Sequence, residues 1–267
     1  ALTAITDGGR NVAIGKDAFV SLTGGLYNVA IGYQAGYGTV SADTNTFIGY
    51  QAGYAITASG NVVIGRQAFA TASSVVNNVC IGHHAMQAVP SGQAINNCVS
   101  IGYQALHGSA STTTGIDGTV AIGKDALTAL TTGGKNIAIG YQCLDAQTDG
   151  ERNIGIGYGA LTAMDSGEDG NIGIGYLAGD SVDNPLSVDN VYIGDEAGRG
   201  GTGAAIGNIA IGAHAMDGTT SNAQTGTIAI GHQALTALTQ GAGNLAVGYD
   251  AMATNKLGDK NIACLLY

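Results

Sequence analysis

A short phrase of alternating residues returns along the whole chain. It reads Asn, an apolar residue, a small residue, Ile and Gly, and three copies followed by Tyr stand between residues 136 and 176. Alternation over a few residues predicts a short strand, and Val and Ile favour strands. The closing glycine marks the point where the backbone turns or is closely approached. We therefore expect Val12 and Ile14 to point into a core and Ala13 to point outward.

The closing glycine recurs 14 times, at intervals of 16 to 21 residues. Such a period predicts a solenoid, in which each repeat forms one coil and pairs with the coils on either side. We expect structural roles for the 14 repeat glycines, which are Gly15, Gly32, Gly49, Gly65, Gly82, Gly102, Gly123, Gly140, Gly157, Gly175, Gly194, Gly212, Gly231 and Gly248.

Asparagine stands four residues before the glycine in 11 copies, and Cys98, Thr119 and Thr227 replace it in the other three. Stacked asparagines can hydrogen-bond from coil to coil, as in zippers of identical side chains. The sequence therefore predicts an asparagine ladder made of Asn11, Asn28, Asn45, Asn61, Asn78, Asn136, Asn153, Asn171, Asn190, Asn208 and Asn244.

The half of each repeat after the glycine has a weaker pattern. Alanine stands three residues after the glycine in 13 copies, with Cys143 the exception, and predicts a tight inward corner. The remainder fits either a second short strand or one helical turn. All variation in length falls between this alanine and the next asparagine slot, and residues 86–97 and 106–118 are the longest excursions. If this piece contacts a receptor, we expect the contact in these two segments, because loops leave a solenoid there.

The two ends of the chain also fit the repeat. Residues 1–11 match residues 126–136 almost letter for letter, so the chain begins inside a repeat. We expect one repetitive segment over residues 1–267, with a partial repeat at 1–10, full repeats at 11–260 and a degenerate repeat at 261–267, where Leu265 takes the place of the glycine. The segment is expected to belong to a longer protein.

Composition excludes several classes of function. Charged residues make up 10% of the chain, against roughly 25% in ordinary globular proteins. The net charge is −10 and there is no basic stripe, so nucleic acid is not an expected partner. No apolar run approaches the roughly 18 residues of a membrane span, so membrane insertion is not expected either. A weakly charged surface predicts association, and we expect a parallel homotrimer with the Ala13-type positions at the chain contacts.

The chain offers few residues for chemistry, and we predict no enzymatic activity, no cofactor and no metal. The Gly-rich stretch 155–159 is a variant of the repeat and lacks the rest of a dinucleotide-binding fingerprint. Cys80, His83 and His84 stand close together in the sequence and suggest a metal site. We do not expect one, because neighbouring residues on a strand point to opposite faces. The tyrosines directly after the repeat glycine fit packing or the stacking of sugars. The four cysteines are expected to be free thiols, with Cys143 and Cys264 buried.

The phrase N-x-A-I-G-Y-Q-A-[LG] resembles the repeats of bacteriophage tail fibres, and more loosely those in the heads of trimeric autotransporter adhesins. The resemblance covers essentially the whole chain. It implies an all-β, left-handed parallel β-roll of 14 to 15 coils, one repeat per coil, in a trimeric fibre. The implied function is the structural shaft of an extracellular fibre, in the virion of a phage, that contributes to host attachment. The alternative is the head of a bacterial surface adhesin. The implied partners are further copies of the chain and host glycans or a receptor.

Overall fold

The computed structural model describes residues 1–90, 92–108, 113–201, 203–218 and 223–264. None of these residues lies in a helix, so none forms a helix able to cross a membrane. The chain divides into two compact units, Ala1–Lys135 and Asn136–Tyr267, and each unit is a stack of coils. The predicted parallel β-solenoid is confirmed, with about 15 turns of about 17 residues each.

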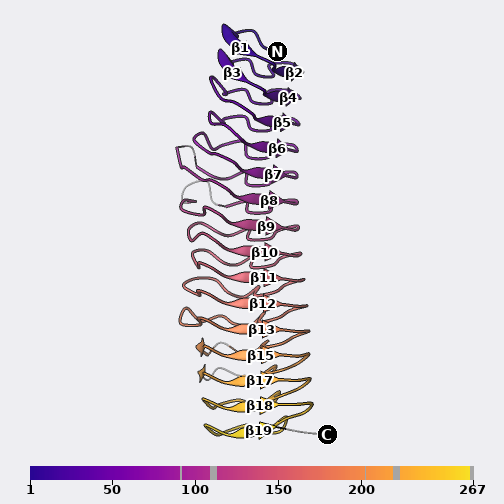
Figure 1. Cartoon of the computed structure of the whole chain (residues 1–267), viewed down its shortest axis with the longest axis vertical. Helices are drawn as coiled ribbons and strands as arrows, with labels where there is room; N and C mark the ends of the chain where they lie inside the picture. Colours follow the sequence, from indigo (N-terminus) through magenta and orange to yellow (C-terminus); the bar gives the residue numbers. More distant parts are fainter. Residues whose placement is uncertain (91, 109–112, 202, 219–222, 265–267) are drawn as a thin grey trace. The chain divides into compact units, whose positions relative to one another are not determined.

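Each coil contributes one three-residue strand, and strands of consecutive coils within a unit pair in parallel (Figure 1). The first unit contains β2 (Val12–Ile14), β4 (Val29–Ile31), β5 (Thr46–Ile48), β6 (Val62–Ile64), β7 (Val79–Ile81), β8 (Val99–Ile101) and β9 (Val120–Ile122). The second unit contains β10 (Ile137–Ile139), β11 (Ile154–Ile156), β12 (Ile172–Ile174), β13 (Val191–Ile193), β15 (Ile209–Ile211), β17 (Ile228–Ile230), β18 (Leu245–Val247) and β19 (Ile262–Cys264). Two further ladders lie just before the asparagine slot and pair β1 (Asp7–Gly9) with β3 (Gly24–Leu26) and β14 (Ala205–Ile206) with β16 (Gln224–Thr225).

The strand register places each slot of the repeat over the same slot of the next coil. Ala13 lies opposite Ala30 in the β2–β4 pair, and Gly155 lies opposite Gly173 in the β11–β12 pair. Like residues therefore form columns. We call the residues two before each repeat glycine the alanine column, and those three and one before it the outer apolar face.

The two faces of the strands are the reverse of our prediction. Apart from the terminal strands β2 and β19, the alanine column is buried, as at Ala30, whereas Val12 is 45% and Ile14 57% exposed. The remaining Val and Ile residues of the outer apolar face are mostly half-buried. The reason lies across the coil, where large side chains such as Phe19 are completely buried and fill the interior. Only a small residue fits opposite them, so the larger Val and Ile are left on the outside.

Bulky residues in the alanine column are matched by missing side chains elsewhere. Phe47 replaces alanine in β5, and its ring packs edge-on against Phe19 with centroids 5.9 Å apart. A Cβ added at Gly36 would lie 2.7 Å from the Phe47 ring, and one at Gly53 would lie 2.5 Å from it. The two glycines therefore make room for the ring. The same arrangement joins Tyr192 to Gly179 and Gly198.

The residues directly after the repeat glycine form turns instead of a strand or a helix, and among the described residues a second short strand occurs in this half only as β1, β3, β14 and β16. Residues two and four after the repeat glycine adopt left-handed backbone angles, as at Gln34 (φ 53°) and Phe19 (φ 46°). This conformation costs a non-glycine residue roughly 1–2 kcal/mol. Hydrogen bonds between coils offset the cost, and the Gln34 N–H donates to the Lys16 carbonyl oxygen at 2.9 Å. The predicted inward corner is confirmed, since Ala35 is completely buried.

The repeat glycines are held by two constraints. Their φ angles lie between 122° and 147°, in the region that L side chains rarely adopt. A Cβ built at Gly15 would also lie 2.6 Å from the carbonyl oxygen of Gly32 on the next coil. Both the backbone angle and the spacing of the coils exclude a side chain in this column.

Candidate functional site

The predicted asparagines lie one above another inside the coils and bond each coil to the next. The Oδ1 atom of Asn28 accepts a hydrogen bond from the Asn45 backbone N–H at 2.9 Å, and its Nδ2 donates to the Ala42 carbonyl oxygen at 2.6 Å. The pattern repeats in the second unit, where Asn171 accepts from the Asn190 N–H at 3.1 Å. Each net hydrogen bond contributes roughly 1 kcal/mol. The column therefore stabilises the coil stack, and its buried amides are not available to a ligand.

The slot directly after the repeat glycine forms a stacked column on the outside of each unit. Tyr33 and Tyr50 stack with centroids 5.4 Å apart. Lys16 lies over Tyr33 and Arg66 over Tyr50, each 5.9 Å from the ring centroid. The ring faces are thus covered by neighbouring coils, so the column supplies packing, and its edges rather than its faces meet solvent. The second unit has the same stacking in Tyr141, Tyr158 and Tyr176.

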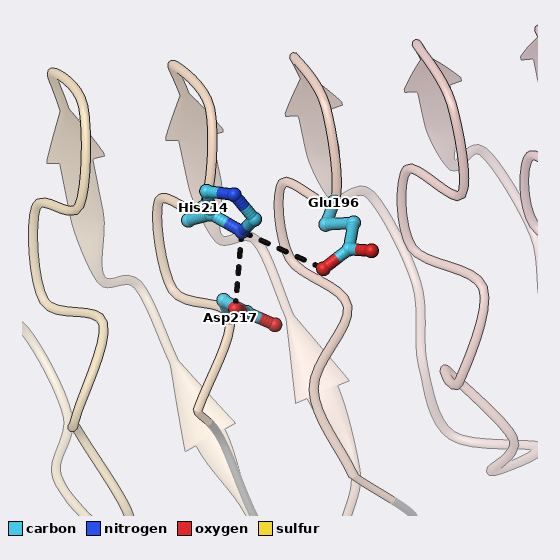
Figure 2. Close-up of side chains that lie close together, drawn as sticks. All are labelled: Glu196, His214 and Asp217. Carbon is cyan, nitrogen blue, oxygen red and sulfur yellow. Dashed lines mark hydrogen bonds and ion pairs between the residues drawn. The ribbon is translucent and has the colours of Figure 1, made fainter.

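A cluster of charged side chains occupies one corner of the second unit. Figure 2 shows His214 between Glu196 of the preceding coil and Asp217 of its own coil. Its Nδ1 atom lies 3.5 Å from Glu196 Oε2 and 3.3 Å from Asp217 Oδ2. Arg199 binds the same Glu196 oxygen at 2.9 Å and reaches Asp180 at 3.5 Å. The coils after Gly194 and Gly212 therefore each contribute one acidic and one basic residue to the cluster.

This ion network has a stacking role rather than a catalytic geometry. Burial raises the pKa of Asp180, while Arg199 lowers it. Burial also disfavours the charge on Arg199, but Asp180 and Glu196 keep its pKa above the ordinary value. A metal ion on Glu196 would have to displace Arg199 from the oxygen that it already holds. The three residues of Figure 2 are therefore explained by their contacts with one another and with Arg199.

A second cluster in the same unit holds three acids without such partners. Asp165, Glu168 and Asp183 each place a carboxylate oxygen within 4.8 Å of the others. Glu168 is fully buried, and neither of its carboxylate oxygens has a hydrogen-bond partner among the described residues. Burial raises the pKa of Glu168 to about 7, nearby backbone N–H groups of Glu168 and Asp165 lower it, and the carboxylates of Asp165 and Asp183 raise it further.

The residues considered for a metal site at Cys80 do not converge. His83 and His84 lie side by side with ring centroids 3.9 Å apart, so our expectation that they point to opposite faces is wrong. The reason is the left-handed backbone at His84, which follows the strand instead of extending it. Cys80 lies inside the coil, with its Sγ 3.5 Å from the sulfur of Met86.

All four cysteines are free, and three of them are buried. Burial raises the pKa of Cys98 to about 11 and that of Cys143 to about 12. Cys264 is exposed, which corrects our expectation of a buried thiol. It lies one residue before the glycine slot and therefore on the outer apolar face, which points away from the core.

A small cavity lies beside Tyr192 and is also lined by Val182 and Met216. Its volume is about 10 Å³. This is close to the space of a single water molecule and is too small for a metabolite.

The two long excursions are only partly described. Residue 91, within 86–97, and residues 109–112, within 106–118, lie outside the described part of the chain. Leu265, where the sequence predicts the break in the repeat, also lies outside it. In the described part, Ile95 and Ile116 are buried and anchor the two excursions.

No family model, curated protein or solved structure matches the chain.

The residue that our sequence reasoning missed is Glu168. Counted back from the next repeat glycine, it stands seven residues before Gly175, in a slot that holds Ile95 and Ile116 in the long repeats. If each repeat is aligned on the glycine that ends it instead of the glycine that begins it, Glu168 falls at the same position as Ile95 and Ile116. This alignment would have marked it as a carboxylate at a buried position.

Proposed function

We propose that the chain is a shaft segment of an extracellular fibre, in which parallel copies pack together through the outer apolar face. The proposal rests on the composition and the exposure of the outer apolar face. In both units, its columns consist of Val, Ile and a few similar residues, contain no charged residue, and remain partly exposed. Soluble monomers rarely leave a continuous apolar patch of this kind open to water.

The assignment of this face replaces our expectation that the alanine column makes the chain contacts. The alanine column is buried inside its own coil and has no surface to offer. The outer apolar face presents the same residue types coil after coil, so parallel copies in register would place like against like. A closed cyclic arrangement covers the face of every copy and stops sideways growth. The resemblance to trimeric fibres supports three copies.

The resemblance of the repeat to phage tail fibres supports a place in a virion and a contribution to host attachment. In this proposal the residues at 86–97 and 106–118 are the candidates for contact with a host glycan or receptor, because their length varies without a change in the strand columns. Shortening both segments to the 17-residue unit should then abolish binding on a glycan array and leave the melting temperature unchanged.

Native mass spectrometry at micromolar concentration tests the assembly. We expect the mass of three chains. Ile64 and Ile81 are neighbours across the β6–β7 pair on the outer apolar face. The double variant Ile64→Glu/Ile81→Glu should give monomers, because it buries charges at the contact.

Ser74→Glu adds one glutamate at an exposed bend away from the outer apolar face and serves as the control, which should remain trimeric. A wild-type chain that stays monomeric in this experiment, with the outer apolar face open to solvent, contradicts the proposal.

A further inference from the structure

Glu168 places a carboxylate at a position of the repeat that faces the interior of the coil. The slot seven residues before the repeat glycine holds small or apolar side chains in most coils, including Val75, Ile95 and Ile116. The backbone is fixed there, because the Glu168 carbonyl oxygen accepts a hydrogen bond from Asn153 Nδ2 at 2.6 Å. The side chain is completely buried. A buried polar group without a partner destabilises the fold, and a buried charge does so more strongly.

Two further carboxylates lie beside it on consecutive coils. Asp165 stands eight residues after Gly157, and Asp183 stands eight residues after Gly175, so both occupy the same slot of the repeat. An oxygen of each lies within 4.8 Å of the other and of a Glu168 oxygen. No ion pair to a basic side chain involves these acids in the described part of the chain. Three like charges at this separation repel one another unless a cation joins them.

A second buried polar side chain lies on the preceding coil. Gln147 occupies a slot held by Leu22, Ile56 and Leu130 in other coils, and neither of its amide atoms has a partner among the described residues. A Cβ added to Gly150 would meet both Gln147 Nε2 and the carbonyl oxygen of Glu168, so the two polar residues are neighbours. The interior of these two coils therefore holds two polar side chains without a hydrogen-bond partner among the described residues.

We propose that Asp165, Glu168 and Asp183 bind a calcium ion. The donors are all carboxylate oxygens, which calcium prefers, and a Ca–O distance of about 2.4 Å puts opposite ligands about 4.8 Å apart. Asp165 and Asp183 are exposed, so they open the site to solvent and leave room for water ligands, whereas Glu168 closes it from the inside. Magnesium would require a tighter octahedron with shorter bonds.

Calorimetry and thermal melting of the whole chain test the site, with calcium chloride added to EDTA-treated protein. We expect heat of binding for one ion per chain. We also expect a melting temperature higher by about 3 °C or more when calcium is at about ten times its Kd. Asp183→Asn, a change at an exposed position, should weaken binding by about tenfold or more. Asp195→Asn removes the same charge from a residue outside the cluster and should bind as the wild type does.

Glu168→Leu separates a binding role from a structural one. It restores the apolar side chain that this slot carries in other coils, so in EDTA the variant should melt at or above the wild-type temperature. It should show no response to calcium. The proposal is overturned if the wild type neither binds calcium nor melts higher in its presence. It is equally overturned if magnesium has the same effect as calcium and Asp183→Asn responds like Asp195→Asn, because that result shows charge screening alone.

Discussion

A repeat glycine is restricted both by its own backbone angle and by the next coil. Gly140 has a φ of 147°, and a Cβ there would collide with the carbonyl oxygen of Gly157. Ala138, two residues earlier, is buried but occupies a slot that accepts Val63 in another coil. Gly140→Val should therefore lower the melting temperature far more than Ala138→Val, with a strain of roughly 1–3 kcal/mol before the clash is counted. Equal melting temperatures for the two variants would contradict this explanation.

The buried carboxyl of Glu168 predicts a pH dependence of stability in the absence of divalent ions. Its pKa is about 7 in the folded chain, against an ordinary value of about 4.5, with Asp165 and Asp183 as the acids facing it. The folded state thus holds the proton more tightly, and the unfolded state releases it first as the pH rises. The stabilisation is complete below about pH 4.5 and is lost as the pH rises through about 7.

Denaturant unfolding in EDTA at pH 5 and pH 8 measures this effect. Glu168→Gln cannot ionise, so its stability relative to the wild type should increase between the two pH values. A constant difference between the two proteins would show that Glu168 does not titrate in this range.

At the scale of the coil, the asparagine ladder has gaps that can be filled. Thr227 takes the place of asparagine in β17's coil, and its Oγ1 atom is buried without a partner in the described structure. Asn208 and Asn244, on the coils before and after, donate their Nδ2 groups to carbonyl oxygens at 3.1 and 2.8 Å. Thr227→Asn should complete the ladder and stabilise the fold by about 1 kcal/mol. Thermal melting would detect a rise of a few degrees.

The reverse change provides the control for the ladder. Asn208→Thr removes an amide whose Oδ1 accepts from the Thr227 N–H at 2.9 Å. It should destabilise the fold by roughly 1–3 kcal/mol, because buried groups lose their partners. If both variants melt like the wild type, the ladder contributes nothing measurable.

The positions of the strands in the main ladders could be predicted from the sequence, but the choice of which face of each strand is buried could not. The repeat glycine and asparagine located the strand that each coil contributes to the main ladders, and the alanine three residues on located the inward corner, as at Ala35. Alternation alone cannot say which face is inside, and we chose the more hydrophobic one. The choice was wrong because the interior of a narrow coil is already filled by side chains such as Phe19, so small residues rather than large ones point inward. The left-handed corner at Gln34 was also hidden, because glutamine has no special preference for it.

The cluster of Asp165, Glu168 and Asp183 was harder to predict, because its members do not share one position in the repeat. Asp165 and Asp183 share a slot counted from the glycine before them, whereas Glu168 shares a slot counted from the glycine after it. The number of residues between the two glycines varies from repeat to repeat. No single alignment of the repeats therefore brings the three acids together. Their convergence follows only from the path of the backbone around the corner.

For the whole molecule, the outward position of Cys264 gives a direct test of parallel assembly. Cys80, Cys98 and Cys143 are buried, and burial raises their pKa values, so at pH 8 they should resist maleimides. Cys264 lies on the outer apolar face and should react. In a parallel three-fold assembly, a short bismaleimide should join two Cys264 residues and leave the third chain single, in a two-to-one ratio on a denaturing gel.

Cys264→Ser is the matched control and should give no covalent dimer. Rapid labelling of Cys264 without any cross-linked product would argue that the copies do not lie in parallel register.

The packing of Phe47 between Gly36 and Gly53 limits how such a gene can recombine. Near-identical repeats invite unequal crossing-over, which deletes or duplicates coils. An exchange that carried β5 next to a coil with Leu144 in place of Gly36 would drive the phenylalanine ring into that leucine, which is itself fully buried. Exchanges within a run of alanine-bearing coils meet no such obstacle. We therefore expect exchanges that preserve the fold in this region to keep together the two adjacent coils that hold Gly36, Phe47 and Gly53.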